Sequence, residues 1–417
     1  MKVFVIGGGG REHGIIYALH KSPKITELFC APGNAGIEKL AKCVPIKATA
    51  IDELVKFARE EKFDLVFVAP EDPLALGLCD RLEEEGIRSF GPKANAARIE
   101  ASKVFSKTLM KKYDIPTADF AIFSQSADAF SYLQTVSFPV VIKADGLALG
   151  KGVVIANDLT EAQAAVHAMM EEAVFQESGK TILIEEYLEG PELTVLAFMD
   201  GEHVLPMISS RDHKRVFDAD QGKNTGGMGA VTPGTQMTED EEKQLYNTIF
   251  LPTVRALREE GCPFTGIIYF GLMLTADGPK VIEYNARMGD PETQAILPRL
   301  QNDFLDVILA CLDKRLPEIH LEWKPGASCC VVLASGGYPE NYETGYPIEG
   351  LEKTSRLVFH AGTKIENQRV VTAGGRVLAV YGEGADLEEA IEDAYTGVSE
   401  ISFKDMHFRK DIGKSSC

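Results

Sequence analysis

The first hundred residues alternate apolar runs with amphipathic stretches, and this alternation limits the possible folds more than any other feature of the chain. Residues 2–7, KVFVIG, form a nearly continuous apolar run, as expected for a strand buried on both faces. Residues 11–22, REHGIIYALHKS, follow with apolar residues at helical spacing. The same order recurs downstream, with strand-like runs at 25–36 and 64–73 and helix-like stretches at 52–63 and 74–86. Alternation of this kind predicts a parallel sheet wrapped by helices, and therefore an α/β fold.

The chain is long enough for several domains. A length of 417 residues suggests about two to four of them as a first expectation. The helical pattern breaks at Pro116, and residues 323–326, WKPG, have the composition of a boundary. We expect four segments: residues 1–118 with the parallel sheet, residues 119–188 as a small unit, residues 189–322 as a larger strand-rich unit, and residues 323–417 as a small α/β domain.

The charge and the cysteines argue against several classes of protein. Lys and Arg number 43 against 62 Asp and Glu, which gives a formal net charge of −19 and argues against a nucleic-acid or anionic-membrane partner. The 8 cysteines are scattered without a CxxC pair, which is typical of a reducing compartment. The N-terminus lacks the pattern of a signal peptide, and no apolar run approaches the ~18 residues of a membrane span. We therefore expect a cytoplasmic protein.

Residues 7–14, GGGGREHG, join the first predicted strand to the first predicted helix. Free N–H groups at the start of a helix favour an anion, and glycines let a ligand approach the backbone. A dinucleotide fingerprint needs a third glycine where His13 stands, so that match fails. Two interpretations remain: a tight turn that serves only the fold, or a phosphate site of mononucleotide size with Arg11 beside it.

A second glycine-rich stretch follows Lys143, which ends another predicted strand. It is not a Walker A loop, because Gly146 and Gly150 are one residue too close together and Gly152 replaces the Ser or Thr that would hold Mg²⁺. A glycine hairpin with a cation such as Lys151 can still fold over phosphates. The alternative is a mobile surface loop with solvated lysines.

The stretch VIEYNAR places three polar groups at alternate positions. If it is a strand, its period of two puts the side chains of Glu283, Asn285 and Arg287 on one face. A polar, wet face of an antiparallel sheet would give the same pattern. An acid, an amide and a guanidinium in a row are also suited to a metal ion and an anion.

Nine sequence blocks, taken in order, cover nearly the whole chain. They are GGREH at 9–13, PGNAG at 32–36, PEDPLALG at 70–77, SKVFSK at 102–107, IKADGLALGKGV at 142–153, EEYLEGPELTV at 185–195, DHKR at 212–215, NTGGMGA at 224–230 and GDPETQ at 289–294. Together they resemble the phosphoribosylamine–glycine ligases, also called glycinamide ribonucleotide synthetases, of the ATP-grasp superfamily. The glycine-rich loop is shared across that superfamily, whereas DHKR with NTGGMG, and GDPETQ, are more specific to this family.

The resemblance implies an ATP-grasp fold and a reaction. An N-terminal Rossmann-like domain on the phosphoribosylamine side would precede a small lid, a core with the metal and glycine sites, and a C-terminal domain. ATP, glycine and 5-phosphoribosylamine would give glycinamide ribonucleotide, ADP and phosphate through a glycyl phosphate, in purine biosynthesis. Such transfers depend on positioning and on charge neutralisation, here with Mg²⁺ or Mn²⁺. We expect the chain to act as a monomer.

The resemblance also implies the residues of the site. The metal ligands would be Glu283 and Asn285. The residues that contact ATP would be Lys103, Lys143, Gly146, Gly150, Lys151, Gly152, Glu186, Leu188 and Glu192. The residues that bind the other substrates would be Gly10, Arg11, Glu12, Asn34, Asp212, Lys214, Arg287, Asp290, Pro291 and Glu292. The catalytic groups would be Arg287, Asp212, Asp290 and Lys143.

Three other functions remain open at this point. The chain could be a sister ATP-grasp ligase that acts on another carboxylate, such as aspartate or bicarbonate. It could be a nicotinamide oxidoreductase, although the failed dinucleotide fingerprint argues against that class. It could also be a nucleotide sensor that binds nucleotide without turnover.

The metal site departs from the superfamily pattern in one respect. Many superfamily members carry a metal-binding Glu on the strand that precedes the one with Glu283, and residues 269–274, YFGLML, offer none.

Overall fold

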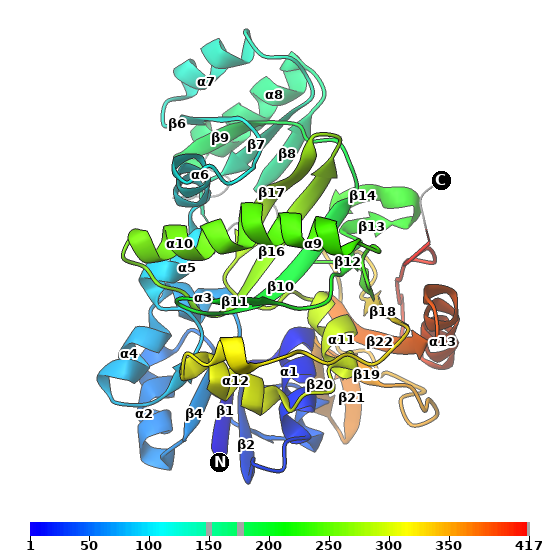
Figure 1. Cartoon of the computed structure of the whole chain (residues 1–417). Helices are drawn as coiled ribbons and strands as arrows, with labels where there is room; N and C mark the ends of the chain where they lie inside the picture. The colour runs from blue at the N-terminus through cyan, green and yellow to red at the C-terminus, as the bar shows by residue number, and fades with distance from the viewer. Residues whose placement is uncertain (147–151, 173–178, 415–417) are drawn as a thin grey trace.

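The computed structural model describes residues 1–146, 152–172 and 179–414. In these residues four sheets and two two-stranded ribbons are stacked along the molecule. The N-terminal sheet lies at one end, a small sheet with two helices lies at the other, and the remaining two sheets lie between them (Figure 1). This mixed architecture confirms the predicted α/β fold class.

The N-terminal sheet is parallel throughout, as the alternating pattern predicts. Its order is β3-β2-β1-β4-β5, with strands at Lys42–Cys43, Glu27–Pro32, Lys2–Gly7, Leu65–Val68 and Ser89–Phe90. The helices of this part are α1 at Gly10–His20, α2 at Ile51–Glu61, α3 at Glu71–Ala75, α4 at Leu78–Glu84, α5 at Ala94–Ala101 and α6 at Lys103–Lys112. Phe4 and Ile6 of β1 belong to one hydrophobic core, and Val3 and Val5 to another. The strand is apolar on both faces because helices cover both.

A separate antiparallel sheet forms the lid-like unit at the top of Figure 1. Its order is β6-β9-β7-β8, with strands at Phe120–Phe123, Ile182–Glu186, Val140–Ala144 and Val153–Ala156. Helices α7 at Ser126–Leu133 and α8 at Leu159–Val166 pack on it, and Leu133, Ile142 and Val166 are part of a core separate from the others. A unit with its own core can be positioned independently of its neighbours.

The central sheet carries the longest strands. Its order is β11-β10-β16-β17, all antiparallel, with strands at Val204–Pro206, Glu192–Asp200, Thr265–Thr275 and Gly278–Asn285. Helices α9 at Glu239–Leu245 and α10 at Leu251–Glu259 pack on one face, and α12 at Phe304–Leu312 packs on the other. Residues of this sheet share both N-terminal cores, so the central and N-terminal parts form one continuous body.

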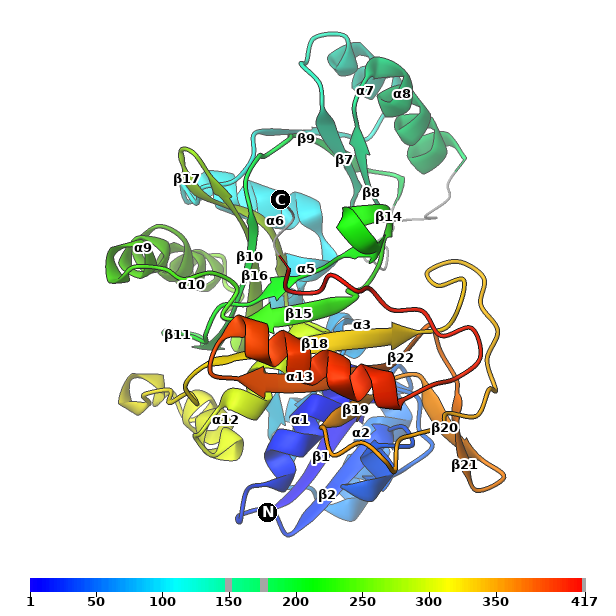
Figure 2. The ribbon, with the colours of Figure 1, turned by 90° about the vertical axis from the view of Figure 1, so that its right-hand side faces the viewer.

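The last sheet combines strands from two distant parts of the chain. Its order is β12-β15-β18-β22-β19, with strands at Arg211–Asp212, Gly229–Thr232, Ala327–Ala334, Arg376–Gly384 and Val358–His360. Helix α13 at Leu387–Glu400 lies against β22 and β18 (Figure 2), and α11 at Glu292–Ile296 lies near β15. The ribbons are β13 at Arg215–Phe217 with β14 at Gln221–Asn224, and β20 at Thr363–Glu366 with β21 at Arg369–Thr372. One sheet thus crosses the expected boundary at 323, and the division into four segments stays a prediction.

The strand expected around residue 283 differs from the prediction in two ways. Strand β17 ends at Asn285, so Arg287 lies beyond the strand rather than on its face. The register with β16 shifts at Ile282, which is a bulge, and Val281 and Tyr284 are both buried. The predicted alternation holds at Glu283 and Asn285, on either side of the buried Tyr284, and was wrong only for Arg287, because the strand ends before it.

Candidate active site

One large cavity lies where the four sheets meet. Its volume is about 1180 Å³, and its lining includes Arg11 of α1, Lys143 of β7, Glu283 of β17 and Arg376 of β22. Pockets for a single small ligand usually enclose ~300–1,000 Å³. This cavity can therefore hold a nucleotide together with smaller substrates.

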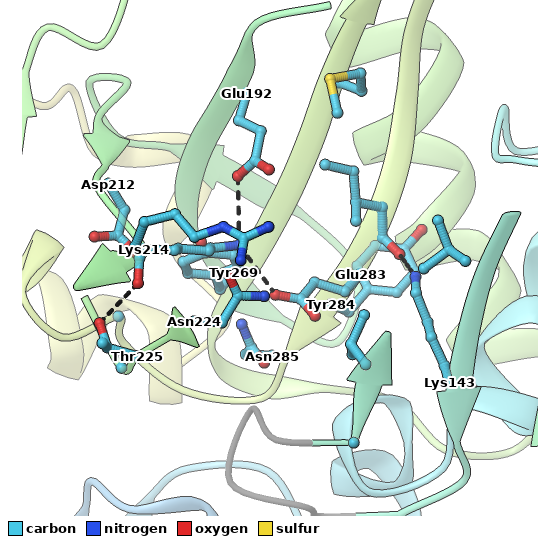
Figure 3. A pocket seen from close by; sticks show the side chains of 18 of the residues that line it. Lys143, Glu192, Asp212, Lys214, Asn224, Thr225, Tyr269, Glu283, Tyr284 and Asn285 are labelled. Carbon is cyan, nitrogen blue, oxygen red and sulfur yellow. Dashed lines mark hydrogen bonds and ion pairs between the residues drawn. The ribbon is translucent and has the colours of Figure 1, made fainter. Parts of the chain in front are cut away.

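The carboxyl end of β17 faces this cavity. Lys214 Nζ lies between two carboxylates, 3.6 Å from Glu283 and 3.5 Å from Glu192 (Figure 3). Burial alone would raise the pKa of Glu283, but the ammonium groups of Lys214 and Lys143 outweigh burial and lower it. Glu283 is thus an ionised oxygen donor, of the kind that Mg²⁺ prefers.

Asn285 lies on the same strand, next to a buried acid. Its amide nitrogen donates to Glu100 Oε1 at 3.1 Å and to the Tyr284 carbonyl at 3.3 Å, in the amide orientation that satisfies both. The amide oxygen then faces away from Glu100. No cluster of three or more His, Cys, Asp or Glu in the described ranges could hold a metal. Glu283 and Asn285 therefore fit a metal that takes its other oxygen ligands from phosphate and water.

Two carboxylates enclose the guanidinium of Arg287. Its Nη2 lies 2.9 Å from Glu100 Oε1, and its Nε lies 3.2 Å from Glu71 Oε2. Glu71 also lies 3.4 Å from Arg11 Nη1, so alternating charges connect α1 to the end of β17. Burial raises the pKa of Glu100 to about 7. At Glu71 burial is outweighed by Arg287 and Arg11, which lower the pKa to about 2.

A buried ion triad lies under the small sheet. Lys143 Nζ and Lys107 Nζ lie 2.9 Å and 2.8 Å from the same oxygen of Glu185, Oε2. The Glu185 side chain is 3% exposed, and its other oxygen has no hydrogen-bond partner among the residues that the structure describes. A buried acceptor without a partner is costly. Since Glu185 lines the cavity, this oxygen marks a place where a ligand donor would fit.

The residues expected around ATP come together as far as they are described. Lys103, Gly146 and Gly152 line the cavity, and Lys103 Nζ donates to the Gly146 carbonyl at 2.9 Å. Gly150 and Lys151 lie outside the described residues.

The connection from the end of β9 to the start of β10 contributes three further lining residues, Glu186, Leu188 and Glu192. The backbone N–H of Asp119 donates to Glu186 at 3.2 Å, and Leu188 is buried. These residues lie where the small sheet joins the central sheet, which places them at the edge of a nucleotide-sized space.

Two acids and a tyrosine form the opposite wall. Asp212 lies at the end of β12, Glu292 begins α11, and Tyr269 lies on β16. Burial first, and the nearby Glu292 second, raise the pKa of Asp212 well above its ordinary value. Asp212 Oδ1 is buried, and no partner for it exists in the described part of the chain. A buried, unpaired carboxyl oxygen beside another acid favours a cationic donor such as an ammonium group.

Asp290 is held on both sides. Its Oδ1 accepts from Gln294 Nε2 at 2.7 Å, and its Oδ2 lies 3.1 Å from Arg376 Nη2. Arg376 also donates to the carbonyls of Asp290 at 2.7 Å and Gly226 at 2.6 Å. Burial would raise the pKa of Asp290, but Arg376, Gln294 and Arg11 together outweigh burial and lower the pKa. The catalytic role expected for Asp290 stays a prediction, and its contacts are those of a residue that holds its neighbours in place.

Four of the expected substrate residues lie apart from this cavity. The described residues Gly10, Glu12, Asn34 and Pro291 are not among those that line it. A Cβ on Gly10 would lie 2.5 Å from Gln294 Nε2, so glycine there allows α1 to approach α11. The expectation that these residues bind phosphoribosylamine stays a prediction.

Two N–H groups at the start of α1 already have acceptors. The Gly9 N–H donates to Glu12 Oε2 at 2.6 Å, and the Arg11 N–H donates to Asp290 Oδ2 at 3.4 Å. A phosphate bound at this helix end would compete with both carboxylates. Arg11 itself does line the cavity.

Sequence reasoning missed several charged residues of the site. Glu71 and Lys107 lie inside the blocks PEDPLALG and SKVFSK. The sequence blocks therefore included both residues but did not indicate which side chains they contact. Glu100 sits in an otherwise ordinary helical stretch, and Arg376 in a stretch that indicates only a strand. Their positions depend on contacts with distant residues, which no local pattern encodes.

The fold defines the class of protein first. The biotin carboxylase domain of a Hydrogenobacter thermophilus 2-oxoglutarate carboxylase superposes with a TM-score of 0.74 at 17% identity, over 98% of this chain and 91% of that one. The family model described as the ATP-grasp (A) domain of phosphoribosylglycinamide synthetase matches residues 101–293. The chain thus has the ATP-grasp fold that its sequence blocks imply.

The particular family follows from the remaining matches. The N and C domain models of phosphoribosylglycinamide synthetase match residues 1–100 and 328–415, and the chain belongs to this family. A Halalkalibacterium halodurans protein named phosphoribosylamine–glycine ligase is 50% identical over 100% of this chain and 97% of its own. One from Clostridium acetobutylicum is 46% identical over 100% of both. The Thermotoga maritima structure of that name has a TM-score of 0.87 at 33% identity, over 99% of this chain and 100% of that one.

None of the helices in the described residues combines the length and the apolar character that crossing a bilayer requires.

Proposed function

We propose that this chain ligates glycine to 5-phosphoribosylamine at the expense of ATP, giving glycinamide ribonucleotide, ADP and phosphate in purine biosynthesis. The observation that carries the proposal is that one cavity brings together Lys143, Glu283 and Asp212, the expected phosphate, metal and amino-acid ends of the site. Family membership and the names of the relatives support the same reaction. We further propose that the chain acts as a monomer in the cytoplasm.

The nucleotide would lie between the small sheet and the central sheet. Lys103 and Lys143 are the cations best placed for its phosphates, because both line the cavity near Glu283 and lower its pKa. The unpaired oxygen of Glu185 would accept a donor from the base, and Glu192 would accept from the ribose hydroxyls.

Glu283 and Asn285 are the residues that would hold a divalent metal, for which we propose Mg²⁺ or Mn²⁺. When bound, the metal would neutralise charge on the phosphates and so favour attack at the γ-phosphorus. The Lys214 ammonium, 3.6 Å from Glu283, keeps that carboxylate ionised. The same lysine connects Glu283 to Glu192, and so connects the metal ligands to the nucleotide contacts.

Glycine would lie at the acidic wall, with its ammonium group on Asp212. That group can donate to Asp212 Oδ1, the buried acceptor without a partner in the described ranges. Its carboxylate would then face Arg287, which the carboxylates of Glu71 and Glu100 hold in a fixed orientation. A carboxylate oxygen attacks the γ-phosphorus, the bond to ADP breaks, and glycyl phosphate forms. Holding both reactants in one cavity lowers the entropic cost of this step.

The second step makes the amide bond. The amine of 5-phosphoribosylamine attacks the acyl carbon of glycyl phosphate, and inorganic phosphate leaves with the bonding electrons. The proton lost by the amine passes to the departing phosphate or to solvent. Arg11 of α1 lines the cavity beside Glu71 and is the cation that we propose for the anionic substrate.

ADP release tests the proposal. The purified chain with ATP and Mg²⁺ should release ADP when glycine and phosphoribosylamine are both present, with an equal amount of glycinamide ribonucleotide. Equal turnover with aspartate or bicarbonate in place of glycine would indicate a sister ATP-grasp ligase. Nucleotide binding without any ADP release would indicate a sensor, and either result would overturn the proposed reaction.

A further inference from the structure

Glu100 contacts three consecutive residues at the end of β17. Its Oε2 accepts from the Ala286 N–H at 2.7 Å. Its Oε1 lies 2.9 Å from Arg287 Nη2 and 3.1 Å from the Asn285 amide nitrogen. The Glu100 side chain is 7% exposed, and its contact with Asn285 is additional to its ion pair with Arg287.

The contact with Asn285 decides which end of the amide faces the cavity. An asparagine can present either its oxygen or its nitrogen, and a hard cation accepts only the oxygen. The Ala286 N–H and the Arg287 guanidinium hold the Glu100 carboxyl group in place. Its Oε1 is an acceptor for the amide nitrogen of Asn285. The Tyr284 carbonyl, 3.3 Å away, is a second acceptor on the same side. Both acceptors favour the orientation that turns the oxygen away from Glu100.

We propose that Glu100 is a positioning residue that orients the Asn285 amide so that its oxygen faces the metal. The inference rests on the metal site of the proposed function and extends it to the residue behind the ligand. Substitution of a residue that hydrogen-bonds to a metal ligand typically weakens metal binding by ~10–100-fold.

A competing interpretation is that Glu100 serves only as a counter-ion for Arg287. Glu71 provides the matched control, because it also pairs with Arg287, at 3.2 Å, and lines the same cavity. None of the contacts found for Glu71 in the described residues involves Asn285. A loss that comes through the guanidinium should therefore appear in both Glu71→Gln and Glu100→Gln.

The test measures Mn²⁺ binding to the ADP complex, without glycine or phosphoribosylamine, so that turnover does not enter. Glu100→Gln should weaken Mn²⁺ binding by ~10–100-fold, because the new amide can donate to the Asn285 oxygen and turn it from the metal. Glu71→Gln should change Mn²⁺ binding by less than about threefold, well below that range. Comparable losses in the two variants, or no loss in Glu100→Gln, would overturn the assignment.

A double variant gives a second measurement that a purely structural role would not reproduce. Asn285→Asp replaces the amide with two equivalent oxygens, so its orientation no longer matters. In that background Glu100→Gln should cost less than about threefold in Mn²⁺ affinity, since the ~10–100-fold effect of a positioning partner is gone. An equal loss in both backgrounds would show that Glu100 supports the fold instead.

The variant Glu283→Gln separates this inference from the metal site on which it depends. A loss of Mn²⁺ binding in Glu283→Gln without one in Glu100→Gln overturns the role of Glu100 alone. Unchanged Mn²⁺ binding in Glu283→Gln overturns the metal site, and the role of Glu100 with it. ADP affinity without metal and the melting temperature, measured for each variant, identify any that fail to fold.

Discussion

Lowering the pH from 7 to 5 should weaken the contact between α1 and β19, where two histidines are buried against each other. His13 Nδ1 accepts from the His360 N–H at 2.7 Å, and the ring centroids are 5.7 Å apart. Burial first, and the neighbouring His360 second, lower the pKa of His13 to about 3. Burial, with Lys39 nearby, lowers that of His360 to about 4.

The sign and the size follow from proton linkage. An unfolded histidine titrates near about 6.5, so below that pH the unfolded chain binds protons that the folded chain does not. Stability is therefore lost as the pH falls from about 6.5 towards the folded pKa values of about 3 for His13 and about 4 for His360. At 1.36 kcal/mol per pH unit, about 1.5 units cost roughly 2 kcal/mol for each histidine by pH 5.

Glu100 acts in the opposite direction. Burial raises its pKa to about 7, so the folded chain takes up that proton before the unfolded chain does. Its contribution makes the protein more stable as the pH falls from about 7 towards the ordinary carboxyl range near about 4.3. The pH dependence of the whole protein is thus a sum of opposing terms, and a difference between two variants is needed to isolate one histidine.

The assay compares the wild type with His360→Gln by urea unfolding between pH 7.5 and 5.0. Because His360→Gln cannot titrate at that position, the stability advantage of the wild type should shrink by roughly 2 kcal/mol as the pH falls from 7 to 5. Exchange of the backbone N–H that His360 donates to His13 should accelerate over the same range in the wild type. A stability difference that stays constant within about 0.5 kcal/mol would refute the reasoning, since surface changes alone remain within that range.

Three further predictions concern the site. Glu283→Gln should slow turnover by at least ~10²-fold at ordinary Mg²⁺ and leave the melting curve nearly unchanged, and near-normal steady-state rates would contradict the metal role. Arg376→Met removes the guanidinium that lies 3.1 Å from Asp290 Oδ2. In separate titrations, this variant should lose more affinity for glycinamide ribonucleotide than for ATP. Equal losses of the two affinities would indicate that Arg376 serves the fold. Gly10→Ala should also weaken binding of glycinamide ribonucleotide, but less, because the new Cβ would lie 2.5 Å from Gln294 Nε2 and displace that amide. Unchanged affinity for glycinamide ribonucleotide would contradict this prediction.

Local patterns in the sequence were enough for the elements and for much of the chemistry. The apolar run of β1 and the helix α1 follow from the spacing of neighbouring side chains, which depends on backbone geometry alone. The ordered sequence blocks indicated the family, and the resemblance to the family indicated Lys143, Glu283 and Asp212 as site residues. All three line one cavity. The predicted strand period was wrong at Arg287, because β17 ends at Asn285 and the alternation does not continue beyond it.

Only the tertiary structure decided which charges face one another. Glu100 and Ala286 are 186 positions apart, yet the packing of α5 against β17 brings them within 2.7 Å. In the same way β22 carries Arg376 to Asp290, and α6 brings Lys107 to the carboxylate that also holds Lys143. A buried charge must be paired wherever the fold places it, and the partner is set by which elements pack together. Sequence spacing therefore indicates the proposed metal ligands along one strand, but not Glu100, the acid proposed to orient Asn285 from another part of the chain.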